Sequence, residues 1–332
     1  MLSSQIQITQ QALAEQQHYG QQPFPLVLVC QDTALDLAGT VAWIEQRRRE
    51  LLDEADTCGA ILFRGFPLAT ADDFDRFVTA FDLPNFPYNE SLSNAVRVNR
   101  TPRIFTANEA PPAINIFLHH EMAQTPVYPI RLFFFCEQPA ESGGATPLCR
   151  SDIVWQHLVE AAPNFARDCE AKGLRYSNVM PEENDSTSGM GRSWQSTLRA
   201  NSRAKAEARL AALGYSWQWL DDGSLRATTP ILPAVHDLGN GRKSFFNQLI
   251  AAYQGWKDVR NDPSKAITFG DGSRLDRATV DRVIQIADEL CFDIPWQSGD
   301  VALVNNYTVM HGRRSFVGTR KVLASLVAQD RM

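Results

Sequence analysis

The chain has 332 residues, of which 44% are hydrophobic and 21% are charged, and its formal net charge is −6. This composition is typical of a compact globular protein and excludes a disordered chain, which would be more polar and poorer in aromatic residues. The negative charge argues against nucleic acid or an anionic membrane as the main partner, because both attract clustered Lys and Arg.

The first 23 residues are rich in glutamine and are expected to form a peripheral segment. They contain neither the basic nor the apolar stretch of a secretory signal, and the apolar run at 24–30 is too short to span a bilayer. We therefore expect a cytoplasmic protein whose six cysteines are free thiols. Because no repeat or linker interrupts residues 24–332, this part is expected to form a single domain.

Helix and strand patterns alternate in the first part of the chain. Apolar residues recur at helical spacing over 35–55, which predicts an amphipathic helix. The segment 58–66 is predicted to be a buried strand. Thr70, with Asp73 three residues later, predicts the N-cap of a helix that continues through Phe81.

From residue 114 onwards strand patterns dominate. Strands are predicted at 114–122, 130–136, 146–149, 301–304 and 322–328, with a hairpin at 215–231. Helices are predicted at 151–171, 202–213 and 273–290, the first two within a helical or lid insertion at about 151–214. Together, these predicted strands and helices indicate a mainly β chain with helical decoration (α+β), built on a double-stranded β-helix, or jelly roll.

A His-His-Glu sequence at 119–121 is the first candidate for chemistry. In a strand, residues i and i+2 point to the same face, so His119 and Glu121 would present an imidazole beside a carboxylate. With a second histidine from a distant strand, this set would hold non-haem Fe(II) and leave positions open for substrate and oxygen. By itself the pair is more typical of a surface strand pair or a structural histidine than of a metal site. His120 would face the other way, into the core or behind the ligands.

The second histidine has few candidates, because the chain contains only six histidines. His18 lies in the glutamine-rich segment, His157 in a predicted helix and His236 in a predicted loop. His311 follows the apolar run 301–304 and precedes Gly312, where a strand is expected to end and a turn to begin. A turn histidine without function remains an alternative interpretation of this residue alone.

Several motifs in order resemble the TauD/TfdA family of Fe(II)/2-oxoglutarate dioxygenases, and most closely its SyrP-like branch, which is found with peptide natural-product pathways. The motifs are GAILFRGF at 59–66, LHHEM at 118–122, RLFFFC at 131–136, GGATPL at 143–148, FNQ at 246–248, GDVALVNN at 299–306, HGRRSF at 311–316 and RKVL at 320–323. The resemblance runs from about residue 23 to the C-terminus. Its specificity comes from the order of the motifs, because none of them is rare alone.

The resemblance implies a role for five residues. His119, Glu121 and His311 match the iron ligands of the family, and these are the expected catalytic residues. Thr146 and Arg320 match the residues that bind the far carboxylate of 2-oxoglutarate. An arginine fork suits a carboxylate because it donates two parallel hydrogen bonds and keeps its charge.

The assignment of Arg320 departs from the family in one respect. It lies nine residues after His311, a shorter spacing than in taurine dioxygenase, and Arg313 and Arg314 are nearby alternatives. A turn through Gly318 is expected to bring the strand of Arg320 back alongside the strand that ends at His311.

The family implies that Fe(II), 2-oxoglutarate and O2 together oxidise an unactivated carbon. In the SyrP-like branch the substrate is an amino acid or a derivative of one, free or attached to a carrier protein. Related halogenases replace the carboxylate ligand with a small residue, so Glu121 favours hydroxylation over chlorination. Desaturation and cyclisation stay open, because they need the same cofactors.

Substrate-side residues are harder to identify from the sequence. Asn247 and the polar loop 181–194, a candidate mobile lid, are the predicted substrate-binding elements. Arg100 and Arg103 are further candidates for an anionic substrate, or else surface residues. Two other functions fit the same ligands: a Zn(II) hydrolase, which would need neither Thr146 nor Arg320, and a non-catalytic jelly-roll binding protein.

Overall fold

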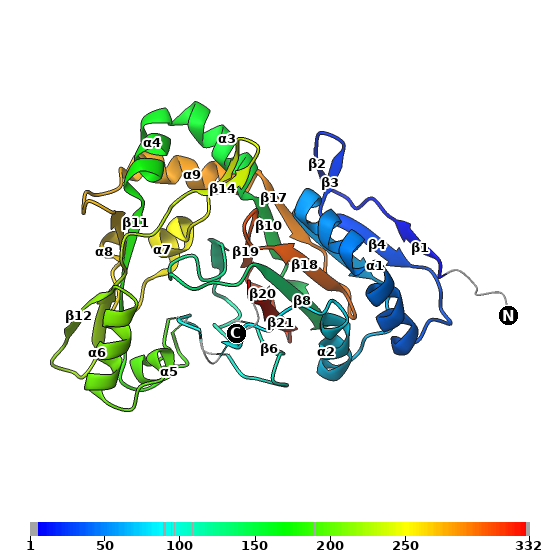
Figure 1. The fold of residues 1–332 in the computed structure, drawn as a ribbon, viewed down its shortest axis with the longest axis horizontal. Helices are drawn as coiled ribbons and strands as arrows, with labels where there is room; N and C mark the ends of the chain where they lie inside the picture. The colour runs from blue at the N-terminus through cyan, green and yellow to red at the C-terminus, as the bar shows by residue number, and fades with distance from the viewer. Residues whose placement is uncertain are drawn as a thin grey trace.

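The computed structural model describes residues 6–88, 91–93, 95, 97–107, 109–188 and 190–329. Figure 1 shows a core of strands with α1 and α2 on one side and the remaining labelled helices, α3 to α9, on the other. None of the helices in the described ranges is long and apolar enough to cross a membrane. The six cysteines are free thiols.

A seven-stranded sheet forms the larger half of the core. Its strands, in spatial order, are β1 (Ile8–Gln10), β4 (Leu26–Cys30), β5 (Ala60–Arg64), β18 (Val301–Asn305), β8 (Arg131–Gln138), β21 (Lys321–Val327) and β6 (Phe105–Thr106). The pairing is antiparallel throughout, except that β4 and β5 are parallel. The glutamine-rich N-terminal segment therefore contributes an edge strand, β1.

A four-stranded sheet faces this larger one. It consists of β17 (Cys291–Ile294), β10 (Thr146–Arg150), β19 (Val309–Arg313) and β7 (Ile116–His119). Val304 of the larger sheet and Val309 of the smaller one belong to one buried apolar cluster, so the two sheets pack against each other. This is the predicted jelly-roll core within an α+β fold.

The outer face of the larger sheet is covered by α1 (Leu37–Cys58) and α2 (Ala71–Thr79). Side chains alternate along β18, so that Leu303 packs with these helices while Val304 faces the smaller sheet. The predicted cap of α2 is confirmed, because Thr70 and Asp73 form a reciprocal capping box.

A helical part packs beside the smaller sheet. It contains α3 (Ser151–Ala161), α4 (Pro163–Lys172), α5 (Trp194–Leu198), α6 (Arg203–Ala212), α7 (Leu249–Gly255), α8 (Pro263–Ala266) and α9 (Arg277–Glu289). A third sheet crosses it, in the order β12 (Ser216–Trp219), β13 (Leu225–Thr228), β11 (Leu174–Met180) and β16 (Ile267–Phe269). Three two-stranded pairs complete the fold: β2 (Gln17–Tyr19) with β3 (Gln22–Phe24), β9 (Ser142–Gly143) with β20 (Phe316–Val317), and β14 (His236–Gly239) with β15 (Arg242–Ser244).

Asp152 at the start of α3 ties this helical part to the core. Its carboxylate accepts two hydrogen bonds from Arg150, at 2.8 and 2.7 Å, and one from Arg242 of β15, at 2.8 Å. Arg150 also donates to the carbonyl of Cys58 at the end of α1, at 3.0 Å. Burial alone would raise the pKa of the Asp152 carboxyl, but the two guanidinium groups lower it below its usual value.

Several predicted elements were wrong in extent. The single helix expected at 151–171 is two helices, because Pro163 has no N–H to continue α3 and instead begins α4. The strand expected at 114–122 covers only β7, so Glu121 lies beyond its end. Strands β4, β11, β17 and β19 were not predicted. The sequence of β19, VMHGR, contains too few β-forming residues to be recognised.

Candidate metal centre and cosubstrate pocket

Two neighbouring strands bring His119 and His311 together. These residues are direct partners in the antiparallel pairing of β7 and β19, and their ring centroids are 4.4 Å apart. His311 therefore lies in the middle of a strand, and the expectation that it marks the end of the 301–304 strand was wrong. The register shifts immediately afterwards, at Gly312, where a Cβ would come within 2.4 Å of the carbonyl oxygen of Ile116. Only glycine fits this close approach.

A turn, rather than strand alternation, positions Glu121. Asn306 accepts a hydrogen bond from the Glu121 backbone N–H at 2.8 Å and donates to the Glu121 carbonyl at 3.0 Å. The same Asn306 amide donates to the carbonyl of Pro129 at 2.7 Å. Met122, the next residue, has a positive φ of 57°, which completes the bend. The carboxylate of Glu121 is thereby turned back toward the histidines.

The three predicted ligands converge in the structure. The ligand atoms of His119, Glu121 and His311 all lie within 4.8 Å of one another, and this is the one such cluster in the described part of the chain. His311 Nε2 is 3.4 Å from Glu121 Oε2. His120 is outside the cluster, with its Nδ1 against the carbonyl of Asn306 and its ring against Phe246. This is the core position expected for it.

Hydrogen bonding and burial prepare His119 to act as a ligand. Its Nδ1 lies 2.7 Å from the carbonyl oxygen of Phe117, and because a carbonyl only accepts, Nδ1 carries the proton. Burial, together with the nearby His311, lowers the pKa of His119 to about 4. The ring is therefore neutral at pH 7, with the Nε2 lone pair free for a metal.

Arg97 is a residue of the site that the sequence did not reveal. Its Nη2 lies 3.2 Å from both carboxylate oxygens of Glu121, and the guanidinium packs over the rings of Tyr88 and Phe105. Burial alone would raise the pKa of Glu121, but Arg97 and His311 hold it well below its usual range. The carboxylate is thus ionised and competent to bind a cation. No motif marks Arg97, because only the folded chain brings it to Glu121.

Thr146 and Arg320 share a small cavity of about 50 Å³ that His119 and His311 also line. Arg320 donates from Nη2 to the Thr146 hydroxyl at 3.2 Å and from Nε to the Gly144 carbonyl at 2.7 Å. Burial, together with Arg313, lowers the pKa of Arg320 to about 10, so the guanidinium stays charged at neutral pH. The cavity therefore offers a fixed positive charge and a hydroxyl next to the histidine cluster.

Arg320 reaches this cavity by a different route from the one expected. Its strand, β21, pairs with β8 and β6 of the larger sheet and does not lie alongside β19. The pairing of Phe316 with Gly143 instead anchors the turn that precedes β21 beside the segment leading to Thr146.

The two alternative arginines are engaged elsewhere. Arg313 lines the small cavity, but it donates to the backbone carbonyls of Ala110, Pro111 and Ile114. Arg314 pairs with Asp293, and both side chains are exposed. Arg320 therefore fits a carboxylate in the small cavity better than either of them.

His119 also lines a larger cavity of about 400 Å³. His119, Glu121 and Arg97 line it, and so do residues of the 181–194 loop, namely Asp185, Thr187, Ser188 and Met190. Since His119 and Arg97 line both cavities, the ligand cluster lies where the two meet. The predicted loop thus lines the larger cavity, whereas Arg320 and Thr146 line the small one.

The other predicted substrate residues do not line this cavity. Asn247 is buried, and its amide is used within the chain, donating to the Ala234 carbonyl and accepting from the Leu249 N–H. These hydrogen bonds give Asn247 a structural role, and the substrate-binding role expected for it stays a prediction. Arg103 donates to the carbonyl of Leu83, and neither it nor Arg100 is among the lining residues.

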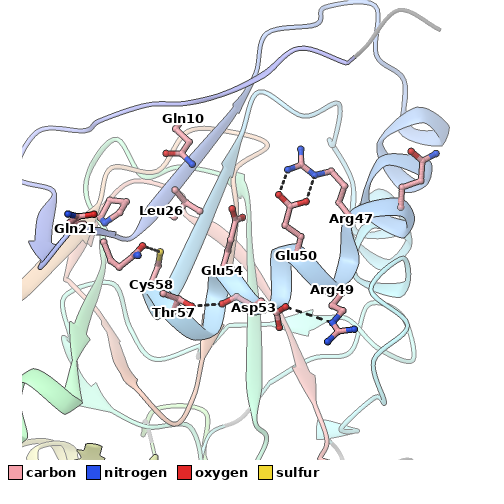
Figure 2. A pocket seen from close by; sticks show the side chains of 13 residues that line it. Gln10, Gln21, Leu26, Arg47, Arg49, Glu50, Asp53, Glu54, Thr57 and Cys58 are labelled. Atoms are coloured by element: carbon pink, nitrogen blue, oxygen red, sulfur yellow. Dashed lines mark hydrogen bonds and ion pairs between the residues drawn. The ribbon is translucent and has the colours of Figure 1, made fainter. Parts of the chain in front are cut away.

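A hollow of about 750 Å³ lies away from the cluster, between α1 and the N-terminal strands (Figure 2). Figure 2 shows that four of its charged side chains form pairs along α1, Arg47 with Glu50 and Arg49 with Asp53. Paired, hydrated charges of this kind are typical of a solvated helix face. We therefore assign the chemistry to the buried cluster of His119, Glu121 and His311 and not to this hollow.

The donor set fits divalent iron. Two imidazoles and one carboxylate on one side of a centre suit non-haem Fe(II), and they leave the opposite side open. Here His119 lines both the cavity that contains Arg320 and the cavity that the loop lines. The ionised Glu121 and the neutral His119 are in the protonation states that metal binding requires.

Comparison with known proteins agrees with this site. A family model described as "Taurine catabolism dioxygenase TauD, TfdA family" matches residues 22–326. A clavaminate synthase-like protein of Arabidopsis thaliana is 39% identical over 329 residues, covering 97% of this chain and 99% of the relative. The dapdiamide synthesis protein DdaC of Enterobacter agglomerans is 29% identical over 294 residues, covering 84% of each protein.

Solved structures share the fold at low sequence identity. PvcB of Pseudomonas aeruginosa has a TM-score of 0.55 at 14% identity, covering 99% of this chain and 94% of that one. A putative alpha-ketoglutarate-dependent 2,4-D dioxygenase of Burkholderia xenovorans has a TM-score of 0.53 at 14% identity, covering 97% of each. The narrower resemblance to the SyrP-like branch stays a prediction. The chain belongs to the TauD/TfdA family of dioxygenases, whose cofactors are Fe(II), 2-oxoglutarate and O2.

Proposed function

We propose that this protein is an Fe(II)/2-oxoglutarate-dependent oxygenase in which His119, Glu121 and His311 bind the iron. The observation that carries the proposal is that His119 and His311 also line the cavity of Arg320 and Thr146. A metal ligand set and a carboxylate-binding pair thus lie in one continuous site. When bound, iron and 2-oxoglutarate would supply the activation of O2 for oxidation of an unactivated carbon.

The hydrogen bonds of Thr146 support a direct role in binding 2-oxoglutarate. Its hydroxyl oxygen accepts from Arg320 Nη2 at 3.2 Å and from Trp296 Nε1 at 3.0 Å. A hydroxyl has two acceptor positions and one proton, so with both positions occupied the proton of Thr146 is directed to another group. A carboxylate in the small cavity would accept from Thr146 and from Arg320 together.

The chain's other residues hold the site in shape and keep water away. Asn306 fixes the backbone of Glu121, and the carbonyl of Phe117 fixes the ring of His119. Phe134 packs against His311, with the two ring centroids 5.1 Å apart. Such fixed ligands and apolar walls orient the reactants and limit side reactions with solvent.

For the reaction itself we propose hydroxylation of an amino acid or an amino-acid derivative, free or attached to a carrier protein, in a natural-product pathway. Two similar proteins support the pathway: one is named for dapdiamide synthesis, and the other, PvcB, is described as an oxygenase from an isonitrile synthetic pathway. Glu121 supports hydroxylation over halogenation, because the carboxylate occupies the position that a halide would need.

The test is an anaerobic titration of the purified protein with Fe(II) and then 2-oxoglutarate, following the visible metal-to-ligand charge-transfer band. We expect the band in the wild type. In Arg320→Ala it should appear only at higher 2-oxoglutarate, by about tenfold or more, because a charged hydrogen-bond pair is lost. Arg314→Ala is the matched control, since Arg314 pairs with Asp293 on the surface.

The same titration separates the alternatives. A Zn(II) hydrolase on these ligands would bind metal with no dependence on 2-oxoglutarate, and a non-catalytic binding protein would give no band and consume no oxygen. Iron binding without a band on addition of 2-oxoglutarate would rule out the proposed function.

A further inference from the structure

Cys149 and Cys291 lie directly opposite each other on neighbouring strands of the smaller sheet. They are partners in the antiparallel pairing of β10 and β17, which run side by side in Figure 1. The side chains of such partners point to the same face of the sheet, and their Cα atoms are about 4.5 to 5.5 Å apart. A disulfide needs Cα atoms about 4.4 to 6.8 Å apart, so the register alone brings the two residues within bonding range.

The two thiol groups also converge on one acceptor. Cys149 Sγ donates to the carbonyl oxygen of Ala287 at 3.3 Å, and Cys291 Sγ donates to the same oxygen at 3.2 Å. Burial raises the pKa of the Cys149 thiol well above its usual value, and a side-chain hydrogen bond with Cys291 raises it further. The two sulfur atoms are therefore neighbours at the end of α9.

This pair differs from the other cysteines in two respects. Among the described residues, no other two cysteines are register partners or donate to the same group. Cys149 is fully buried, whereas Cys291 is partly exposed, so a small oxidant from solvent meets the Cys291 sulfur first. The pair thus combines one sulfur that solvent can reach with a second one held beside it.

We propose that Cys149 and Cys291 form a reversible disulfide when hydrogen peroxide oxidises the protein, and that this bond locks β10 to β17. The Cys291 sulfur attacks one peroxide oxygen, becomes a sulfenic acid, and the other oxygen leaves as water. The Cys149 sulfur then attacks the Cys291 sulfur, and the sulfenic oxygen leaves as a second water. The two sulfurs together lose two electrons to the peroxide, and their two protons end in the two waters. A dithiol reductant restores both thiols.

The bond would stabilise the sheet that carries the two histidines. β10 pairs on its other side with β19, the strand of His311, so a link to β17 fixes the middle of this sheet from one edge. The link also closes the long segment 149–291, which restricts the unfolded chain. Oxidation removes two thiol donors from the Ala287 carbonyl, but thiols are weak donors, so this loss is small.

The test treats the full-length protein with hydrogen peroxide, in the presence of a chelator so that iron does not decompose the peroxide. Remaining thiols are alkylated in denaturant, and tryptic peptides are analysed by mass spectrometry. We expect two of the six thiols to be lost, and peptides 132–150 and 283–313 to be joined with the loss of two hydrogens. Dithiothreitol should separate the peptides. The melting temperature should rise by about 5 °C on oxidation and return on reduction.

Three variants assign the link. Cys149→Ala and Cys291→Ala should each abolish both the joined peptides and the rise in melting temperature. Cys136→Ala is the matched control, because Cys136 lies in the same tryptic peptide as Cys149 and pairs with Val322 on the other sheet. It should keep the link. The mass of the wild-type peptides shows by itself whether the bond forms, so the result does not depend on how well the variants fold.

Three outcomes would overturn the proposal. The first is an oxidised Cys291 without joined peptides, and the second is a link that persists in Cys149→Ala, which would assign it to Cys136. The third is a link that leaves the melting temperature unchanged, which would remove the lock. Because the test needs neither Fe(II) nor 2-oxoglutarate, its outcome is independent of the charge-transfer titration and of the proposed function.

Discussion

Asn306 holds both backbone polar groups of Glu121, accepting from its N–H at 2.8 Å and donating to its carbonyl at 3.0 Å. The two residues are 185 positions apart in the sequence, so the metal ligand from one motif is fixed by a side chain from another. Glu121 lies beyond the end of β7 and has no strand partner of its own. Its position therefore depends on this one buried side chain.

Replacing Asn306 by Ala should damage both stability and metal binding. Three buried hydrogen bonds are lost, so we expect unfolding to become easier by about 3 kcal/mol. Metal affinity should fall at least tenfold, because the carboxylate is no longer oriented. Denaturant unfolding and Mn(II) titration measure the two effects. Asn305→Ala is the control, since Asn305 bonds Asp56 and Tyr307 and does not touch Glu121.

Replacing Gly312 by Ala should separate the two histidines. The new Cβ would come within 2.4 Å of the Ile116 carbonyl oxygen, and β7 and β19 would have to move apart at the position next to the His119–His311 pair. We expect weaker metal binding by titration, together with a lower melting temperature. Gly241→Ala, in a turn with open space around the Cβ, should cost only its backbone strain and leave metal affinity unchanged.

Replacing Thr146 by Val should affect 2-oxoglutarate and not the metal. Valine keeps the shape of threonine but removes the hydroxyl that Arg320 and Trp296 hold in place. We expect the 2-oxoglutarate concentration at half-saturation of the charge-transfer band to rise about tenfold, with Fe(II) affinity unchanged. Thr146→Ser keeps the hydroxyl and should stay near the wild type. Equal loss in the Val and Ser variants would contradict a role for the hydroxyl.

The ion pair of Asp152 should make stability depend on pH in a defined direction. The pKa of Asp152 is lowered in the folded protein, so its contribution is complete above its usual value of 3.8 and is lost as pH falls toward the lowered pKa. Asp152→Asn leaves Arg150 buried without its carboxylate and should cost about 3 kcal/mol at pH 7. Denaturant unfolding from pH 7 to 3 should show the difference from wild type shrinking only below 3.8. Asp82→Asn, at a surface pair with Arg48, should cost less than about 1 kcal/mol throughout.

The sequence was sufficient for those features that depend on local pattern. The cap at Thr70 and the strand around 301–304 follow from local patterns. The convergence of His119, Glu121 and His311 was predicted from the resemblance to the TauD/TfdA family. The sequence was insufficient to predict elements whose structure depends on tertiary contacts. The strand of His311 is polar and contains glycine, and it exists because β10 and β7 pair with it on either side.

Residues without a motif were also beyond the sequence. Nothing in the printed sequence distinguishes Arg97 from the neighbouring Arg100 and Arg103, and only the fold buries it against Glu121. Asn247, by contrast, stands in a family motif, yet its amide hydrogen-bonds two backbone groups, the Ala234 carbonyl and the Leu249 N–H at the start of α7. The partner of Arg97 is distant in the sequence, and the partners of Asn247 are backbone groups. A pattern of side chains along the sequence predicts neither kind of contact.

The five residues of β19 limit where insertions and deletions can be tolerated in this chain. His311 supplies a proposed ligand, Gly312 allows the close approach to β7, and Arg313 fastens the segment at 110–114. Because side chains alternate between the faces of a strand, inserting or deleting one residue before His311 would turn all three to the wrong face at once. Length variation in relatives that keep this chemistry is therefore expected in the 181–194 loop and not between residues 305 and 313.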